Sequence, residues 1–152
     1  GVAFGMEVIA WSRNLTEEAA AEAGATRVTK DELFGRSDVL TIHMKLSERS
    51  TGLVGAAELA QMKPTALLVN TSRGPIVDEA DLVQALRSRT IGAAALDVFD
   101  TEPLPAGHPL RTLDNVLATP HIGYVADRPS RIFYRDAVAA ISAWLDQQHT
   151  DQ

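Results

Sequence analysis

Ala66–Asn70 (ALLVN) is the stretch that most clearly indicates the fold of this chain. It is apolar up to its last residue, and Pro64 stands two positions before it. A short apolar run of this kind is typical of a strand that is buried on both faces of a parallel sheet. We therefore expect such a sheet, with a helix preceding Pro64, because helices usually end before a proline.

Similar runs recur along the chain and alternate with helical patterns. Strands are predicted at Glu7–Trp11, Thr26–Val28, Asp38–Met44, Ala66–Asn70, Ile91–Phe99 and Val116–Ala118. Helices are predicted at Thr16–Ala23, Lys30–Phe34, Gly55–Met62, from Asp78 to about Arg87, and from Pro129 to about Gln147. Thr16 and Asp78 are expected N-caps, and Gly24 is expected to end its helix. This alternation predicts an α/β fold with a doubly wound, mostly parallel sheet.

The composition is that of an ordinary globular protein. The chain has 152 residues, of which 45% are hydrophobic and 22% charged, and its formal net charge is -6. The negative charge argues against a nucleic-acid partner. The chain has no cysteine, which excludes disulfides and thiolate sites, and no metal site is predicted. No apolar run approaches the roughly 20 residues of a membrane helix. A cytoplasmic protein without a membrane partner is expected.

Reactive residues follow three of the predicted strands directly. Arg73 follows the strand Ala66–Asn70, Glu102 follows the strand that ends at Phe99, and His121 follows the last short strand. Ligands of open parallel sheets bind beyond the carboxyl ends of the strands. Arginine can hold a carboxylate through two hydrogen bonds, and histidine can give or take a proton near neutral pH. Each residue alone is uninformative, but together they predict a carboxylate-binding acid–base site without naming the reaction.

At these positions the chain resembles the D-isomer-specific 2-hydroxyacid dehydrogenases. The resemblance rests on Val69–Glu79 (VNTSRGPIVDE), on Ala95–Phe99 (ALDVF) with Glu102–Leu104 (EPL), and on Thr119–Gly123 (TPHIG). It extends to residues 43–55 and to Met62-Lys63-Pro64, and so covers nearly the whole chain in the family's order. It implies an oxidoreductase that transfers a hydride between NAD(P)H and a small 2-oxo or D-2-hydroxy acid, with glyoxylate and hydroxypyruvate as examples.

The resemblance also implies the roles of individual catalytic residues. Arg73 would bind the substrate carboxylate and help to polarise its carbonyl. His121 would be the general acid in reduction and the general base in oxidation. Glu102 would accept a hydrogen bond from that histidine and raise its pKa.

Further residues are implied to bind the cofactor. Asp97 would contact the nicotinamide carboxamide, Thr71 and Ser72 would meet the nicotinamide end through their backbone, and Gly123 would allow a close approach. Met44 stands where the family's chain passes the adenosine. The expected cofactor-binding set is Ser12, Arg13, Met44, Thr71, Ser72, Arg73, Asp97, His121 and Gly123.

One departure from the family pattern bears on the choice of cofactor. Many members end the second strand with an aspartate that binds the ribose hydroxyls of NAD, whereas this chain has Ser12 followed by Arg13. The missing carboxylate removes the repulsion of a 2′-phosphate, and Arg13 can pair with that group. The alternative is that Arg13 stacks on the adenine or faces solvent. NAD or NADP is expected, with NADP slightly favoured.

The second departure concerns the domains. The family's glycine-rich turn and first strand are not in this chain, so a Rossmann-like sheet without its first strand is expected. We predict an incomplete dinucleotide-binding domain over residues 1–125 and a crossover helix over 126–152, directed to a substrate domain elsewhere. Such a fragment is expected to be inactive alone. The resemblance suggests that the protein forms a homodimer.

Two further interpretations stay open. Relatives in this family include transcriptional corepressors, so a dinucleotide-sensing binding protein is the alternative to an enzyme. The chain could also be a truncated piece without a function of its own. Glu102 and His121 match the hydroxyacid branch of the family better than the formate branch, which resembles a glutamine-containing variant.

Overall fold

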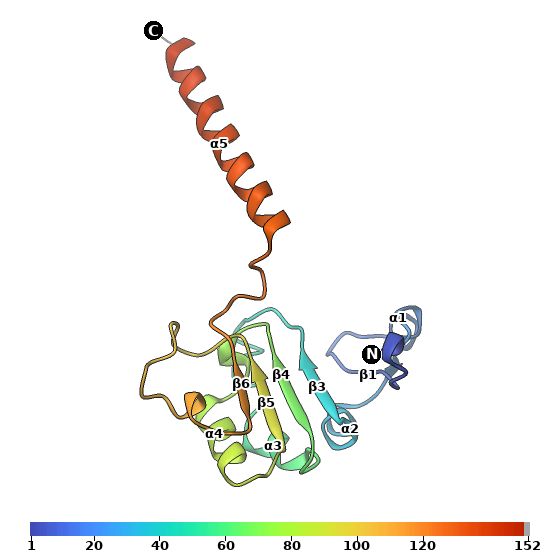
Figure 1. The fold of residues 1–152 in the computed structure, drawn as a ribbon. Coiled ribbons are helices and arrows are strands. Elements are labelled where there is room, and N and C mark those ends of the chain that lie inside the picture. Colours follow the sequence, from blue (N-terminus) through green and yellow to red (C-terminus); the bar gives the residue numbers. More distant parts are fainter. Residues whose placement is uncertain (151–152) are drawn as a thin grey trace. The chain divides into compact units, whose positions relative to one another are not determined.

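The computed structural model describes the backbone of residues 1–150 and the side chains of residues 1–147. It contains two compact units, Gly1–Pro120 and His121–Gln152. The first unit carries every strand, and the second carries the long helix α5 (Asp127–Thr150) (Figure 1). The predicted division into residues 1–125 and 126–152 stays a prediction. The last two residues of the second segment, 151 and 152, lie outside the described part of the chain. No helix among the described residues is long and apolar enough to span a membrane.

The strands of the first unit form two parallel sheets. The smaller sheet pairs β1 (Ile9–Ala10) with β2 (Thr26–Arg27). The larger sheet has the order β3 (Val39–Ile42), β4 (Leu67–Asn70), β5 (Ala93–Leu96) and β6 (Val116–Ala118). Figure 1 shows these four strands side by side. The parallel α/β fold expected from the sequence is confirmed.

The register of the larger sheet brings the carboxyl ends of its four strands level. Ile42 pairs with Asn70, Asn70 with Leu96, and Leu96 with Ala118. The four residues therefore lie in one row across the sheet. The residues that follow them leave the sheet at the same edge, which is where the sequence predicted a site.

The helices connect the strands. They are η1 (Val2–Phe4), α1 (Glu17–Glu22), α2 (Lys30–Arg36), α3 (Ala56–Gln61), η2 (Gly74–Ile76), α4 (Glu79–Arg87) and η3 (Pro109–Arg111). The Thr16 hydroxyl accepts a hydrogen bond from the Ala19 N–H, and the Asp78 carboxylate accepts one from the Asp81 N–H. Both predicted N-caps are thereby confirmed. Gly24, with a φ of 72°, stands just past α1 as expected. The short helices η1, η2 and η3 were not predicted.

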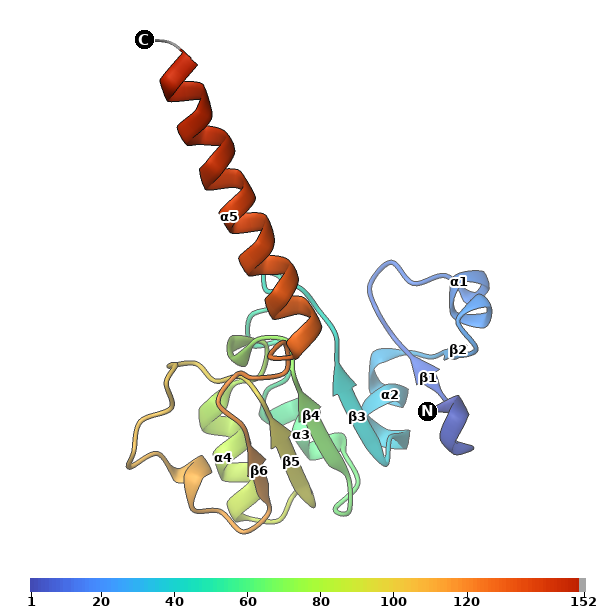
Figure 2. The ribbon, with the colours of Figure 1, turned by 45° about the horizontal axis from the view of Figure 1, so that its top comes forward.

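The core lies on one face of the larger sheet. Phe34 of α2, Leu59 of α3 and Leu86 of α4 pack in one cluster with inward residues of the strands such as Leu68. Figures 1 and 2 show α3 and α4 together behind these strands. Burial of this apolar face is the main stabilising contribution to the unit.

The expectation that Ala66–Asn70 is buried on both faces is wrong for this structure. Burial alternates along β4, with Leu68 and Asn70 buried but Leu67 and Val69 only half-buried. On the neighbouring strands the same face exposes Val39 by 47% and Leu117 by 68%. The physical reason is that α3 and α4 pack on the opposite face.

Several element bounds differ from the predictions. Only Ile9 and Ala10 of the expected strand Glu7–Trp11 pair, because β2 is the neighbour of β1 and contributes only two residues to the ladder. Within Ile91–Phe99, strand pairing is confined to Ala93–Leu96. Helix α5 begins at Asp127, so that Pro129 lies in its first turn. Proline is tolerated there because its position has no intrahelical N–H bond to lose.

β1 and β3 belong to separate sheets and do not pair. An open groove runs between them, lined by Glu7, Val8 and Ile9 on one side and by residues 38–41 on the other. Figure 2 shows the two strands as neighbours without a strand between them. β1 and β3 are thus edge strands of their respective sheets.

Candidate active site

Hydrogen bonds tie the carboxyl ends of the four strands to one another. The Ser72 hydroxyl donates to the Ile42 carbonyl (2.7 Å), the Asp97 N–H donates to the Asn70 carbonyl (3.0 Å), and the Thr119 N–H donates to the Leu96 carbonyl (2.9 Å). Each residue just past a strand thus bonds to the neighbouring strand. The edge is therefore a continuous framework rather than a set of independent loops.

Asn70 shapes the turn that carries Arg73. Its side chain is 1% exposed and donates to the Arg73 carbonyl (2.9 Å), while its Oδ1 accepts from the Ser72 N–H (3.0 Å). A buried amide with both ends satisfied rigidifies the backbone around it. Asn70 was not among the predicted site residues, although a polar residue that ends an apolar strand was a usable signal.

Arg73 itself lies at the surface of this edge. It is exposed, and its guanidinium donates to the adjacent Ser72 carbonyl (2.6 Å). One face of the guanidinium fork is therefore held by the turn, and the group retains further N–H donors for an anion. The expected role of Arg73 as a carboxylate anchor stays a prediction.

Asp97 follows β5 directly and is 7% exposed. Its Oδ1 accepts a hydrogen bond from the Thr119 hydroxyl at 2.5 Å, which joins the ends of β5 and β6. Burial of a carboxylate is costly unless hydrogen bonds compensate for the lost water. Asp97 lies at the predicted edge, one strand away from the turn that carries Arg73.

Glu102 stands on the loop that leaves β5. It is exposed, and its Oε1 accepts the Phe99 N–H at 3.0 Å, so that the loop folds back on its own beginning. Glu102 and Arg73 thus belong to neighbouring loops of the same unit.

Gly74 brings these two loops into backbone contact. A Cβ atom at Gly74 would lie 2.1 Å from the Phe99 carbonyl carbon and 2.6 Å from the Asp100 nitrogen. Only glycine permits this approach, since those neighbours are backbone atoms that cannot move aside locally. Because Gly74 has no side chain, the backbones of the Arg73 turn and the Glu102 loop can pack directly against each other.

His121 and Gly123 belong to the second compact unit. His121 has a φ of 54°, which is uncommon for a residue with a side chain and occurs preferentially at functional positions. Its ring meets the Tyr124 ring edge to face, with 5.8 Å between the centroids. The expected meeting of His121 with Glu102 and Arg73 stays a prediction.

The remaining predicted cofactor contacts lie at the ends of three strands. Ser12 and the exposed Arg13 follow β1 in the smaller sheet. Met44 follows β3, is half-buried and packs against the core, so its backbone rather than its side chain is available to a ligand. Thr71 is exposed at the end of β4. Asp97 and Thr71 offer polar groups that suit a carboxamide, and Arg13 offers a cation that suits a phosphate.

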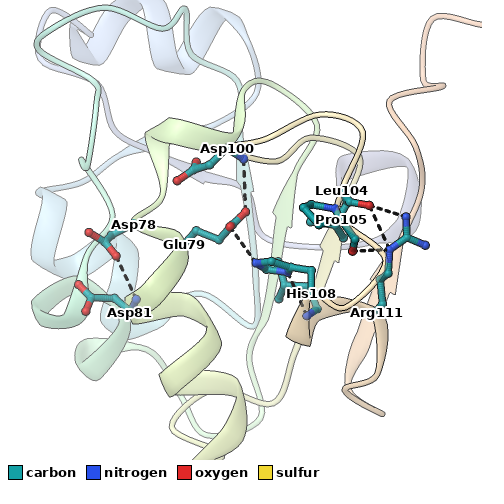
Figure 3. Close-up of polar contacts among 9 residues, drawn as sticks. Asp78, Glu79, Asp81, Asp100, Leu104, Pro105, His108 and Arg111 are labelled. Atoms are coloured by element: carbon teal, nitrogen blue, oxygen red, sulfur yellow. Dashed lines mark hydrogen bonds and ion pairs between the residues drawn. The ribbon is translucent and has the colours of Figure 1, made fainter.

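One acidic group near the Glu102 loop, Asp100, has a perturbed pKa. Burial, and then the charges of Glu79 and Asp78, raise the pKa of Asp100 above its ordinary value. Glu79 accepts the Asp100 N–H at 3.3 Å and lies 3.0 Å from His108 Nε2 (Figure 3). These residues belong to neither predicted set. The described residues contain no group of His, Asp and Glu that could hold a metal ion.

Comparison with known proteins shows what the chain is similar to. Residues 1–123 match the family described as D-isomer specific 2-hydroxyacid dehydrogenase, NAD binding domain. A curated glyoxylate/hydroxypyruvate reductase B of Enterobacter agglomerans is 44% identical over 93% of the chain and 44% of its own length.

Two solved structures share the fold. A phosphoglycerate oxidoreductase from Vibrio cholerae has a TM-score of 0.85 and 34% identity, over 93% of this chain and 47% of its own. A D-isomer specific 2-hydroxyacid dehydrogenase from Xanthobacter autotrophicus, in complex with NADPH and MES, has a TM-score of 0.70 and 40% identity, over 78% and 38%. The chain thus spans less than half the length of each of these relatives.

Proposed function

This chain belongs to the D-isomer specific 2-hydroxyacid dehydrogenase family, and from that premise we propose that its protein reduces small 2-oxo acids to D-2-hydroxy acids with NAD(P)H. The observation that carries the proposal is the hydrogen-bonded carboxyl edge of the larger sheet. There the turn of an exposed arginine, Arg73, contacts through Gly74 the loop of a carboxylate, Glu102. Glyoxylate and hydroxypyruvate are the proposed substrates, supported by the curated reductase that the chain resembles.

In this proposal Arg73 binds the substrate carboxylate. The Ser72 carbonyl orients the guanidinium, and the Asn70 amide orients the backbone on either side of it. A bidentate pair with the substrate fixes the position of the adjacent carbonyl carbon. The nicotinamide supplies the hydride to that carbon when the cofactor is bound.

His121 then donates the proton that the carbonyl oxygen needs as the hydride arrives, and in oxidation it takes the proton back. Glu102 accepts a hydrogen bond from the other ring nitrogen, which orients the imidazole. When the cofactor is bound, Asp97 would accept a hydrogen bond from the nicotinamide carboxamide, and the backbone around Thr71 and Gly123 would border the ring.

The proposed cofactor preference follows from Ser12 and Arg13. Arg13 is exposed at the end of β1 and pairs with a 2′-phosphate, so NADP is favoured over NAD. A homodimer and a cytoplasmic location complete the proposal, the first supported by the family resemblance and the second by the lack of cysteine.

The test uses the complete natural protein. NADPH and NADH oxidation is measured with glyoxylate, hydroxypyruvate and pyruvate. We expect His121→Ala to lower kcat by about a hundredfold or more. Arg73→Ala is expected to lower kcat/KM by about ten- to a hundredfold through loss of a charged hydrogen bond. Arg87→Ala, an exposed arginine in the last turn of α4, is the matched control and should leave both constants unchanged.

The two parts of the proposal fail separately. Tight cofactor binding without turnover of any 2-oxo acid would favour the dinucleotide-sensing alternative. Turnover that Arg13→Ala shifts toward NADH would support the phosphate contact, whereas an unchanged NADPH-to-NADH ratio of kcat/KM would refute it.

A further inference from the structure

Behind the candidate active site, Glu79 joins the two ends of the loop that carries Glu102. Its Oε2 accepts the Asp100 N–H at 3.3 Å, and its Oε1 lies 3.0 Å from His108 Nε2. Figure 3 shows the carboxylate between the Asp100 nitrogen and the His108 ring. Glu79 and His108 side chains are each 20% exposed, which limits competition from water.

The Glu79 side chain is not needed to cap helix α4. It is the first residue of α4, but Asp78 already caps that helix by accepting the Asp81 N–H at 3.0 Å. The Glu79 carboxylate instead reaches across to a different loop. Because Glu79 follows the segment Arg73–Asp78 in the chain, it links the element after Arg73 to the loop of Glu102.

The His108 ring is oriented for this contact. Its Nδ1 accepts the Leu110 N–H at 3.3 Å at the start of η3. A nitrogen that accepts must be unprotonated, so the ring proton lies on Nε2 and is donated to Glu79. His108 thus has two separable functions, one as a cap of η3 and one as a donor to Glu79.

The middle of the loop is held independently by Arg111. The Arg111 guanidinium donates to the Leu104 carbonyl (2.6 Å) and the Pro105 carbonyl (2.9 Å) (Figure 3). The segment between Asp100 and His108 is therefore fixed on both sides, with Glu102 near its beginning. Glu79 and His108 hold the backbone and the far end of this segment, and we infer that they act on Glu102 through that backbone.

We propose that Glu79 and His108 form a clamp that positions the Glu102 loop for catalysis. The inference rests on the proposed function, since it assigns Glu102 a place at the reacting centre. Both members of the clamp are positioning residues. Loss of the clamp leaves the Asp100 backbone N–H without its acceptor and lets Glu102 move relative to the Arg73 turn. A shift of about 1 Å at such a site costs up to about a hundredfold in rate.

Two substitutions of His108 separate the clamp from the helix cap. His108→Gln keeps an amide N–H near the position of Nε2 but loses the acceptor for Leu110. His108→Asn keeps an acceptor near the position of Nδ1 but loses the donor to Glu79. In the complete natural protein, we expect His108→Asn to lower kcat about tenfold or more with the NADPH Kd within twofold. His108→Gln is expected to retain at least half of kcat.

Glu79 provides the second arm. Glu79→Ala is expected to lower kcat as His108→Asn does, and the double variant should add less than the product of the two effects, because one contact is lost twice. Equal kcat for His108→Asn and His108→Gln, or a larger loss in His108→Gln, would overturn the clamp in favour of a cap. Should Glu79→Ala fail to fold, the His108 pair still decides.

Hydrogen exchange separates this inference from the proposed function. The Asp100 N–H should exchange faster in His108→Asn than in the wild type, and unchanged exchange refutes the clamp whatever the enzyme does. A wild type that turns over no 2-oxo acid refutes the proposed function while leaving the exchange result to judge the clamp. A wild type that turns over while all three variants match it refutes the clamp alone.

Discussion

The contact between Gly74 and Phe99 gives the sharpest prediction for the candidate site. In Gly74→Ala the new Cβ would lie 2.1 Å from the Phe99 carbonyl carbon, whereas carbon atoms normally approach to about 3.5 Å. One of the two loops must therefore retreat by about 1.4 Å. Both neighbours are backbone, and Phe99 is buried, so no side-chain rotation relieves the overlap.

The expected effect has two components. Overpacking of this size costs about 3 kcal/mol in the free energy of unfolding. The retreat also separates the Arg73 turn from the Glu102 loop, and a misplacement of about 1 Å costs up to about a hundredfold in kcat/KM. The assays are urea unfolding and 2-oxo acid reduction on the complete natural protein.

Gly107→Ala is the matched control. A Cβ at Gly107 meets no atom within 4 Å, and its backbone is not left-handed. We expect this variant to match the wild type in both assays. If Gly74→Ala unfolds at the same urea concentration as Gly107→Ala and keeps its activity within twofold, the close approach of the two loops is not required, and the steric argument is refuted.

Three further predictions concern stability. Asn70→Ala removes both hydrogen bonds of a buried amide. We expect the free energy of unfolding, measured with urea, to fall by about 2 kcal/mol and the KM for the 2-oxo acid to rise. An unchanged KM would argue against a role of Asn70 in orienting the Arg73 turn. Burial acts to raise the pKa of Glu58, but hydrogen bonds from Lys30 and the backbone outweigh it, so the pKa is lowered. The Glu58 carboxylate therefore stabilises the fold at pH values above its ordinary pKa. This contribution is lost as the pH falls through the lowered pKa of the folded state. Thermal unfolding of Glu58→Gln should therefore show a smaller loss of Tm on acidification than the wild type. Because the pKa of Asp100 is raised, by burial and then by the charge of Glu79, its ionisation disfavours the fold as pH rises, and Asp100→Asn should have a higher Tm than the wild type at pH 7 but not at pH 3.

The order and type of the main elements could be predicted from local sequence patterns. Short apolar runs bounded by turn residues, such as Leu67–Asn70, indicate a strand whichever neighbour it pairs with, because burial in a sheet requires apolar residues. Caps such as Thr16 and Asp78 are equally local, since each side chain bonds to a backbone group three residues away. The catalytic candidates Arg73, Glu102 and His121 could be predicted because the position of a residue after a strand is visible in the local sequence.

Features that depend on residues distant in the chain could be found only in the three-dimensional structure. The half-buried second face of β4, the short pairing of β1 and the level ends of the four strands follow from which elements pack together. The roles of Gly74 and Glu79 were equally hidden, because Phe99 and His108 are more than twenty residues away from them. A motif predicts which residues carry the chemistry, but only packing between loops determines what holds those residues in place.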